Sequence, residues 1–287
     1  MKKTISLLAG ITTLALLGTV STSYAGPFIL AGTDADDHGS VTGTVASGVN
    51  QDGWFFMQRS LENLAPGVTN GSKVVAVLGS NPGTQAHNAA LSAFNNSALP
   101  AAGWTLTTYN DAALTTFLSG GLAGAGIVMM DSAGNVSGGA TGAELTAFTN
   151  NATNINTFLG NGGGLFSQSN GYGWVSALVP GLADVSASNT GLALTAAGNA
   201  AFPGLTNADL SAGPWHNYFT NFGAIPVLAT STTSPVGQAV IIGASGGSVT
   251  NPDPTPNGVP DGGSFFAVYL ALGGLAFASR RFALKRA

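Results

Sequence analysis

The sequence predicts an α/β protein with a mainly parallel, flavodoxin-like sheet, helices on both faces of that sheet and a separate apolar helix at the C-terminus. Two observations predict this fold class. Short apolar runs alternate with segments whose apolar residues repeat every three or four positions, a pattern that favours a parallel sheet covered by helices. In addition, 45% of the residues are hydrophobic and only 7% are charged. The chain can therefore bury a sizeable core, and it is not a highly charged disordered protein.

Five short apolar runs are expected to form strands, at residues 28–31, 74–78, 104–109, 126–130 and 164–167. Helices are expected between them, because apolar residues share one helix face at residues 54–64, 114–118 and 145–159. Helix N-caps are expected at Asp52, at Thr141 and at either Asn110 or Asp111, which have short polar side chains. The region 185–247 is less regular, with late strands expected at 227–229 and 239–242.

The first 25 residues have the pattern of a secretory signal peptide. Lys2 and Lys3 precede an apolar run from residue 5 to residue 20, and Ser23 and Ala25 place small residues where a signal peptidase cuts. A membrane anchor is the alternative, but the run is shorter than the ~20 residues of an ordinary span. We therefore expect signal peptidase to cut after Ala25 and the rest of the chain to be exported.

The remaining chain divides into three segments. Residues 26–244 are enough for one domain with a single core, and residues 245–258 have the spaced prolines, glycines and serines of an extended linker. Residues 259–287 contain an apolar stretch, 265–278, followed by Arg280 and Arg281. Basic residues after an apolar stretch stay on the cytoplasmic side of a membrane. This segment is therefore expected to form a short transmembrane helix that leaves the domain outside.

The C-terminal segment also has a specific order of parts: a short motif, one apolar helix and a basic cluster. The motif is Val259-Pro260-Asp261-Gly262-Gly263, and the cluster begins with Arg280 and Arg281. In this order they resemble a variant of the PEP-CTERM sorting signal of Gram-negative bacteria. The resemblance implies recognition by an exosortase, cleavage near the motif and delivery to the cell surface or extracellular polymer. The apolar helix would then be a sorting helix that holds the protein in the membrane before processing.

A second resemblance covers roughly residues 28–243. It rests on five segments, 73–79, 126–131, 158–167, 202–205 and 213–215, chiefly on the glycine run that precedes residue 164. These segments resemble the class I glutamine amidotransferase-like superfamily, and its ThuA-like branch in particular. In catalytic members a cysteine occupies the turn after the strand that corresponds to 164–167. This chain has no cysteine, which excludes that chemistry together with disulfides and cysteine-ligated metal sites.

Polar residues are expected to gather where the parallel strands end, the edge at which open α/β sheets bind ligands. The expected ligand-facing residues are Asp34, Asp36, Asp37, His38 and Asp131. The spacing of Asp34, Asp36 and the glycine at position 39 resembles the start of a calcium loop, although a valine at position 45 excludes an EF-hand. Calcium bound by Asp34 and Asp36, a solvated capping loop and a catalytic cluster are the three interpretations of this segment.

A serine hydrolase site is a further candidate. Residues 167–171 approach the Gly-x-Ser-x-Gly nucleophile elbow, with Ser169 as the nucleophile. Asp209 and His216 follow in the order that a serine, acid and histidine triad allows. The alternative interpretation is an ordinary turn made possible by Gly171.

Two other candidates involve histidine and tryptophan. The three histidines, His38, His87 and His216, would form a soft-metal site if the fold brought them together. Trp215, next to His216 and Tyr218, is a candidate platform for stacking on a sugar.

Charge and targeting together favour one class of function. Eleven acidic residues against two basic ones give residues 26–258 a net charge of −9, which excludes nucleic acid as a partner and leaves extracellular polysaccharide as a candidate. We expect an exported, surface-sorted binding or structural protein of the cell envelope or extracellular matrix, rather than an enzyme. The alternatives are an extracellular serine hydrolase for glycan or ester substrates and a calcium-dependent β-sandwich adhesin.

Overall fold

The computed structural model describes residues 26–134 and 137–244. The predicted signal peptide (1–25), linker (245–258) and sorting segment (259–287) lie outside these residues. Within the two described ranges, none of the helices has the length and apolar character needed to cross a membrane.

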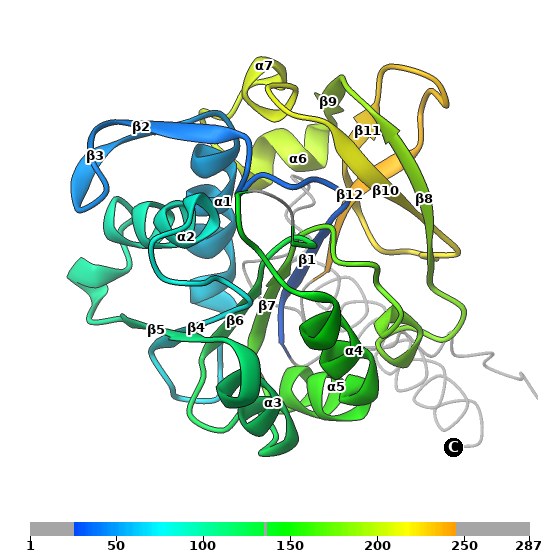
Figure 1. The fold of residues 1–287 in the computed structure, drawn as a ribbon. Coiled ribbons are helices and arrows are strands. Elements are labelled where there is room, and N and C mark those ends of the chain that lie inside the picture. The colour runs from blue at the N-terminus through cyan, green and yellow to red at the C-terminus, as the bar shows by residue number, and fades with distance from the viewer. Residues whose placement is uncertain (1–25, 135–136, 245–287) are drawn as a thin grey trace, which may run out of the picture.

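The centre of the fold is a mixed sheet of ten strands (Figure 1). Five of them are parallel neighbours, in the order β5 (Thr105–Tyr109), β4 (Val74–Leu78), β6 (Ile127–Met130), β7 (Gly164–Ser167) and β1 (Phe28–Ala31). The α/β fold class is therefore confirmed, and the β-sandwich alternative is wrong. The order of β5, β4, β6 and β7 is that of the first four strands in a flavodoxin-like sheet. β1 occupies the next position.

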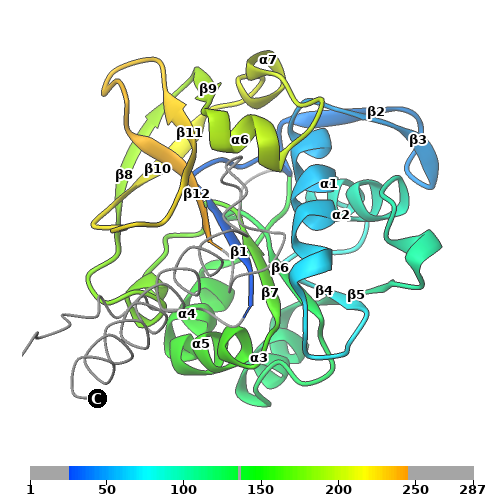
Figure 2. The ribbon, with the colours of Figure 1, turned by 180° about the vertical axis from the view of Figure 1, so that it is seen from behind.

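Helices cover both faces of the parallel strands (Figures 1 and 2). One face carries α1 (Asp52–Leu64) and α2 (Gln85–Asn95), and the other carries α3 (Asp111–Ser119), α4 (Gly142–Asn150) and α5 (Ala152–Gly160). Successive residues of β4 divide between the two cores: Val75 and Val77 pack with α1 and α2, whereas Ala76 and Leu78 pack with α3 to α5. A strand buried on both faces explains why the sequence of β4 is a continuous apolar run.

The second half of the chain extends the sheet with antiparallel strands. β12 (Ala239–Ala244) pairs with β1, and β10 (Trp215–Thr220) and β8 (Ala183–Asn189) follow it. On its other side β12 pairs with β11 (Val227–Ser231), which pairs with β9 (Leu192–Leu194). Two short helices, α6 (Ala196–Ala201) and α7 (Asn207–Leu210), connect these strands. The late strands expected at 227 and 239 are confirmed, whereas β8, β9 and β10 were not predicted.

A hairpin of β2 (Gly39–Thr44) and β3 (Ser47–Gln51) forms a separate sheet against α1 and α2. Its residues are mostly exposed or half-buried, so it has no apolar run that would predict it. The elements of residues 26–134 and 137–244 also include three single turns of 3₁₀ helix: η1 (Ala65–Gly67), η2 (Pro100–Ala102) and η3 (Val175–Ala177).

Two local predictions need correction. The helix expected at residues 145–159 is two helices, α4 and α5, separated at Asn151, whose side chain donates to the Ala147 carbonyl (2.9 Å). That local bond competes with continuation of the helix. At α1 the N-cap is Gln51, and Asp52 is the first helical residue. The N-caps at Thr141 and Asn110 are confirmed.

Candidate functional site

The site lies at the carboxyl ends of the parallel strands. β5 lies on one side of β4 and β6 lies on the other, so the ends of β4 and β6 flank a topological switch point, where open α/β sheets bind ligands. Ser80 follows β4 and Asp131 follows β6, and both are fully buried. The Ser80 hydroxyl donates to Oδ2 of Asp131, which joins the two strand ends.

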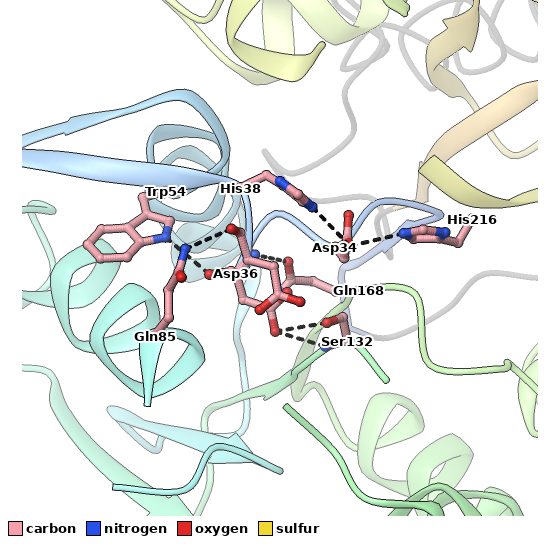
Figure 3. A network of polar contacts seen from close by, with 9 residues as sticks. Asp34, Asp36, His38, Trp54, Gln85, Ser132, Gln168 and His216 are labelled. Carbon is pink, nitrogen blue, oxygen red and sulfur yellow. Dashed lines mark hydrogen bonds and ion pairs between the residues drawn. The ribbon is translucent and has the colours of Figure 1, made fainter. Parts of the chain in front are cut away.

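The loop that follows β1 crosses this edge and is tied to it by Asp36. Oδ2 of Asp36 accepts hydrogen bonds from the backbone N–H and the hydroxyl of Ser132, both 3.1 Å long. The backbone N–H of Asp36 donates to Oε1 of Gln168 (3.0 Å), and its carbonyl accepts from Nε1 of Trp54 (3.2 Å). Figure 3 shows Asp36 between these partners. The ends of β1, β6 and β7 are thus joined through one buried residue, Asp36, by its side chain and its backbone.

Four carboxyl groups gather here: Asp34, Asp36, Asp37 and Asp131, hereafter the carboxylate cluster. All are buried, with Asp36 and Asp131 fully so. Burial raises the pKa of Asp36 to about 6 and, with the charges of Asp36 and Asp34, raises that of Asp37 to about 7. The pKa of Asp131 is also raised, by burial and by the neighbouring Asp36. Burial therefore disfavours the charged forms of Asp36, Asp37 and Asp131, a cost that a bound cation would offset.

Several carboxyl oxygens of the cluster are buried without a hydrogen-bond partner in the described protein. Among them are Oδ1 of Asp34, Oδ1 of Asp36 and Oδ1 of Asp131, and Nε2 of Gln168 also lacks a partner. A buried, unpaired polar atom costs roughly 1–3 kcal/mol, so several of them in one place are unusual for a purely structural region.

Asp34 belongs to a second group, which we call the histidine–aspartate cluster: Asp34, His38 and His216. Oδ2 of Asp34 lies 2.9 Å from Nε2 of His216 and 3.4 Å from Nε2 of His38. Figure 3 shows the carboxylate between the two imidazoles. The Asp34 hydrogen bond raises the pKa of His216, and partial burial opposes it. Both imidazoles are more than one-third exposed, so the histidines face solvent whereas Asp34 and the other carboxyl groups are buried.

The backbone holds both histidines firmly. His216 lies in β10, and its N–H donates to the carbonyl of Gly32 (2.6 Å), the residue that directly follows β1. The His38 carbonyl accepts from the N–H of Gly53 (2.9 Å) at the start of α1. Gly213 packs against the His38 ring so closely that a Cβ there would lie 2.4 Å from the ring's Cγ. A small pocket borders Asp34 and His38, with Phe56, Asp209 and Leu210 in its walls.

The structure does not assemble the predicted serine triad. The hydroxyl of Ser169 donates to Oδ1 of Asn217, whose Nδ2 donates to Oδ2 of Asp184 (2.8 Å). Asp209 instead caps α7, where Oδ2 accepts from the N–H and the hydroxyl of Thr206, both 2.7 Å. His216 is bonded to Asp34 rather than to either of them. Ser169 is buried, as in the alternative interpretation of an ordinary turn.

The other candidates are separated by the fold. Asp34 and Asp36 direct their Oδ2 atoms to different partners, and among the described residues no group of three or more histidine, cysteine or acidic side chains is arranged to hold a metal ion. Of the three histidines, His38 and His216 both contact Asp34, but His87 lies on α2. Trp215 is fully buried, so the prediction of an exposed stacking platform is wrong.

Several residues of this edge were missed because their strand was not recognised. Burial alternates along β10, where Trp215, Asn217 and Phe219 face inward. A polar residue at an inward position of a strand predicts a buried hydrogen bond, which would have identified Asn217 and its partner Asp184. Gln85, whose Nε2 donates to the Asp37 carbonyl (2.7 Å), has no comparable signal in the sequence.

Comparison with known proteins adds no relative. No family model matches this chain, and no curated protein or solved structure is significantly similar to it.

Proposed function

We propose that this chain is an exported, surface-sorted binding or structural protein of the cell envelope or extracellular polymer matrix, without catalytic activity of its own. Its ligand-facing edge comprises the carboxylate cluster and the adjoining His38. The observation that carries this proposal is the convergence of Asp34, Asp36, Asp37 and Asp131 at the switch point, with buried carboxyl oxygens that lack partners.

The energetics of burial support a binding role for this edge. Burying carboxyl groups without complete pairing lowers the stability of the fold, and such strain is usual where a ligand supplies the missing contacts. The chemistry of the edge suits a cation, calcium included, or a ligand rich in hydroxyl groups, such as a polysaccharide, because carboxylates accept hydrogen bonds. The hydrolase alternative has no comparable support, because Ser169 contacts neither Asp209 nor His216.

The targeting half of the proposal rests on the two ends of the sequence. Signal peptidase and an exosortase would act in turn, and the C-terminal helix would hold the protein in the membrane between the two steps. Mass spectrometry of the protein recovered from its native cells tests this directly. We expect a chain that begins at Gly26 and ends near residue 260. A chain that retains Met1 and Arg286 would overturn the targeting proposal.

The binding half is tested by calorimetry on the full-length chain. Calcium and then neutral and acidic oligosaccharides are titrated into the wild-type protein, Asp131→Asn and Asp36→Asn. The exposed Asp111→Asn, which changes the net charge equally, is the matched control. We expect one of these ligands to bind the wild type and Asp111→Asn alike and to bind both cluster variants more weakly. Equal binding by all four proteins would place the ligand elsewhere, and no binding by any of them would refute this edge as the site for these ligand classes.

A further inference from the structure

We propose that two copies of this chain associate through β5, which pairs antiparallel with β5 of a second copy about a twofold axis. The pairing would join two ten-stranded sheets into one continuous sheet. This inference goes beyond the proposed function, because β5 contributes no residue to the carboxylate cluster. It suits a structural component of a matrix, in which copies of one protein contact one another.

The outer edge of β5 has backbone groups without a partner. β5 is the last strand of the parallel row, and β4 is its neighbour in the sheet (Figure 1). The N–H of Thr105 and the carbonyl of Tyr109 both bond to residues that flank β4. Because alternate residues of a strand face opposite sides, Leu106 and Thr108 direct their N–H and C=O groups away from β4, where the described residues offer them no partner.

The sequence of β5 lacks the features that protect such an edge. Proteins usually shield an exposed edge strand with charged side chains, proline or a bulge, because unpaired backbone groups attract another strand. Residues 104–110 contain no charged residue and no proline, and β5 pairs with β4 in a regular register along its whole length. At the opposite margin of the sheet, β8 includes a charged residue, Asp184. The edge at β5 is therefore the one suited to strand pairing.

The direction of the backbone groups fixes the register of the pairing. In an antiparallel pair, two opposite residues that both face the neighbouring strand exchange two hydrogen bonds. Leu106 of each copy would thus lie opposite Thr108 of the other, which is the register that uses both outward-facing residues. Thr107 then lies on the twofold axis, opposite Thr107 of the second copy. Its side chain is exposed, so the two threonines would meet on the surface of the joined sheet.

The charges at the two ends of β5 are complementary in this orientation. Lys73 lies beside the beginning of β5, where its Nζ donates to the Ala102 carbonyl (2.8 Å), and Asp111 follows the end of β5. Both side chains are exposed, and neither forms an ion pair with another described residue. Antiparallel pairing brings Lys73 of each copy near Asp111 of the other. Exposed ion pairs contribute little to affinity, so these charges orient the copies whereas the backbone bonds hold them.

Analytical ultracentrifugation of the full-length chain in a mild detergent tests the proposal. Because a short strand pair offers few bonds against the cost of association, we expect a reversible dimer that forms as the concentration rises from about 10 µM to about 1 mM. Thr107→Lys and Thr107→Glu each place like charges opposite one another on the axis, and each should weaken the dimer about tenfold or more. An equimolar mixture of the two variants should dimerise again, because lysine then faces glutamate.

The matched control is Thr146→Lys, which makes the same substitution at an exposed position of α4 and should dimerise as the wild type does. Recovery in the mixture also shows that both Thr107 variants are folded. A wild-type chain that stays monomeric over this range would overturn the proposal. A dimer that Thr107→Lys weakens no more than Thr146→Lys does, or a mixture that stays monomeric, would overturn it as well. Failure here leaves the proposed function intact, because that is tested by ligand binding to Asp36→Asn and Asp131→Asn.

Discussion

The buried carboxyl of Asp36 makes the stability of the protein depend on pH in a direction opposite to that of most salt-bridged aspartates. Its pKa rises from 3.8 to about 6 on folding, mainly because burial disfavours the charged form. The folded state therefore holds this proton more tightly than the unfolded chain does. The stabilising contribution is fully present below about pH 4 and is lost as the pH rises through about 6.

The magnitude follows from the shift. A change of about two pKa units corresponds to roughly 3 kcal/mol in the free energy of unfolding, and no discount for solvent applies because Asp36 is fully buried. Asp36→Asn removes this dependence while its side-chain oxygen can still accept from Ser132. We therefore expect the difference in stability between Asp36→Asn and the wild type to shift by about 3 kcal/mol in favour of the variant between pH 4 and pH 8.

Urea denaturation of the full-length chain at a series of pH values, in the presence of a chelator, measures this difference. Comparison of the two proteins removes the contribution of His216, whose raised pKa also lowers stability as the pH rises. The charge of Asp36 helps raise the pKa of Asp37, so the coupling between these two carboxyls is part of the measured difference. The exposed Asp111→Asn should give a curve parallel to that of the wild type. If the curve of Asp36→Asn is parallel to the wild-type curve as well, the reasoning about buried charge is wrong.

Three further substitutions test the packing that positions the site. Tyr172→Phe removes a buried hydroxyl that lies 2.6 Å from the Ala31 carbonyl and 2.9 Å from the Ser167 carbonyl. The free energy of unfolding, measured by urea denaturation, should fall by about 1–3 kcal/mol. A neutral result would mean that water hydrogen-bonds the two carbonyl oxygens in the variant. Phe56→Ala removes a fully buried ring with two edge-on phenylalanine neighbours and should cost about 3–5 kcal/mol, with a loss below 1 kcal/mol contradicting the assigned core. Thr141→Ala removes the capping box of α4 and should cost about 1 kcal/mol, whereas Thr141→Ser should retain most of it.

The core of the parallel sheet was predictable because its signals are local. The strands at residues 28–31, 74–78 and 164–167 have the bounds expected from their apolar runs, since a strand buried on both faces must be apolar throughout. The half-exposed strands β8 and β10 mix polar and apolar residues, and β2 and β3 have almost no apolar residues to bury. Their strand conformation depends on pairing partners that are distant in the sequence.

The same distinction holds for the candidate site. The rule that ligands bind beyond the carboxyl ends of parallel strands was enough to place Asp34, Asp36, Asp37 and Asp131 at one edge. It could not show which of them pair. Asp209 has a local partner, Thr206, that satisfies it at the N-terminus of α7, and this removes it from the predicted triad.

The sequence by itself determined the α/β class, the parallel strands and the edge at which polar side chains collect. The reason is that hydrophobic periodicity, and the alternation of strand and helix patterns that indicates parallel strands, depend on residues close together in the sequence. Only the tertiary structure decided that His216 meets Asp34 across 182 positions of chain, that Trp215 is buried and that Ser169 bonds to Asn217. These contacts depend on the register of β10 beside the end of β1, and register is fixed by packing of the whole sheet rather than by any local pattern.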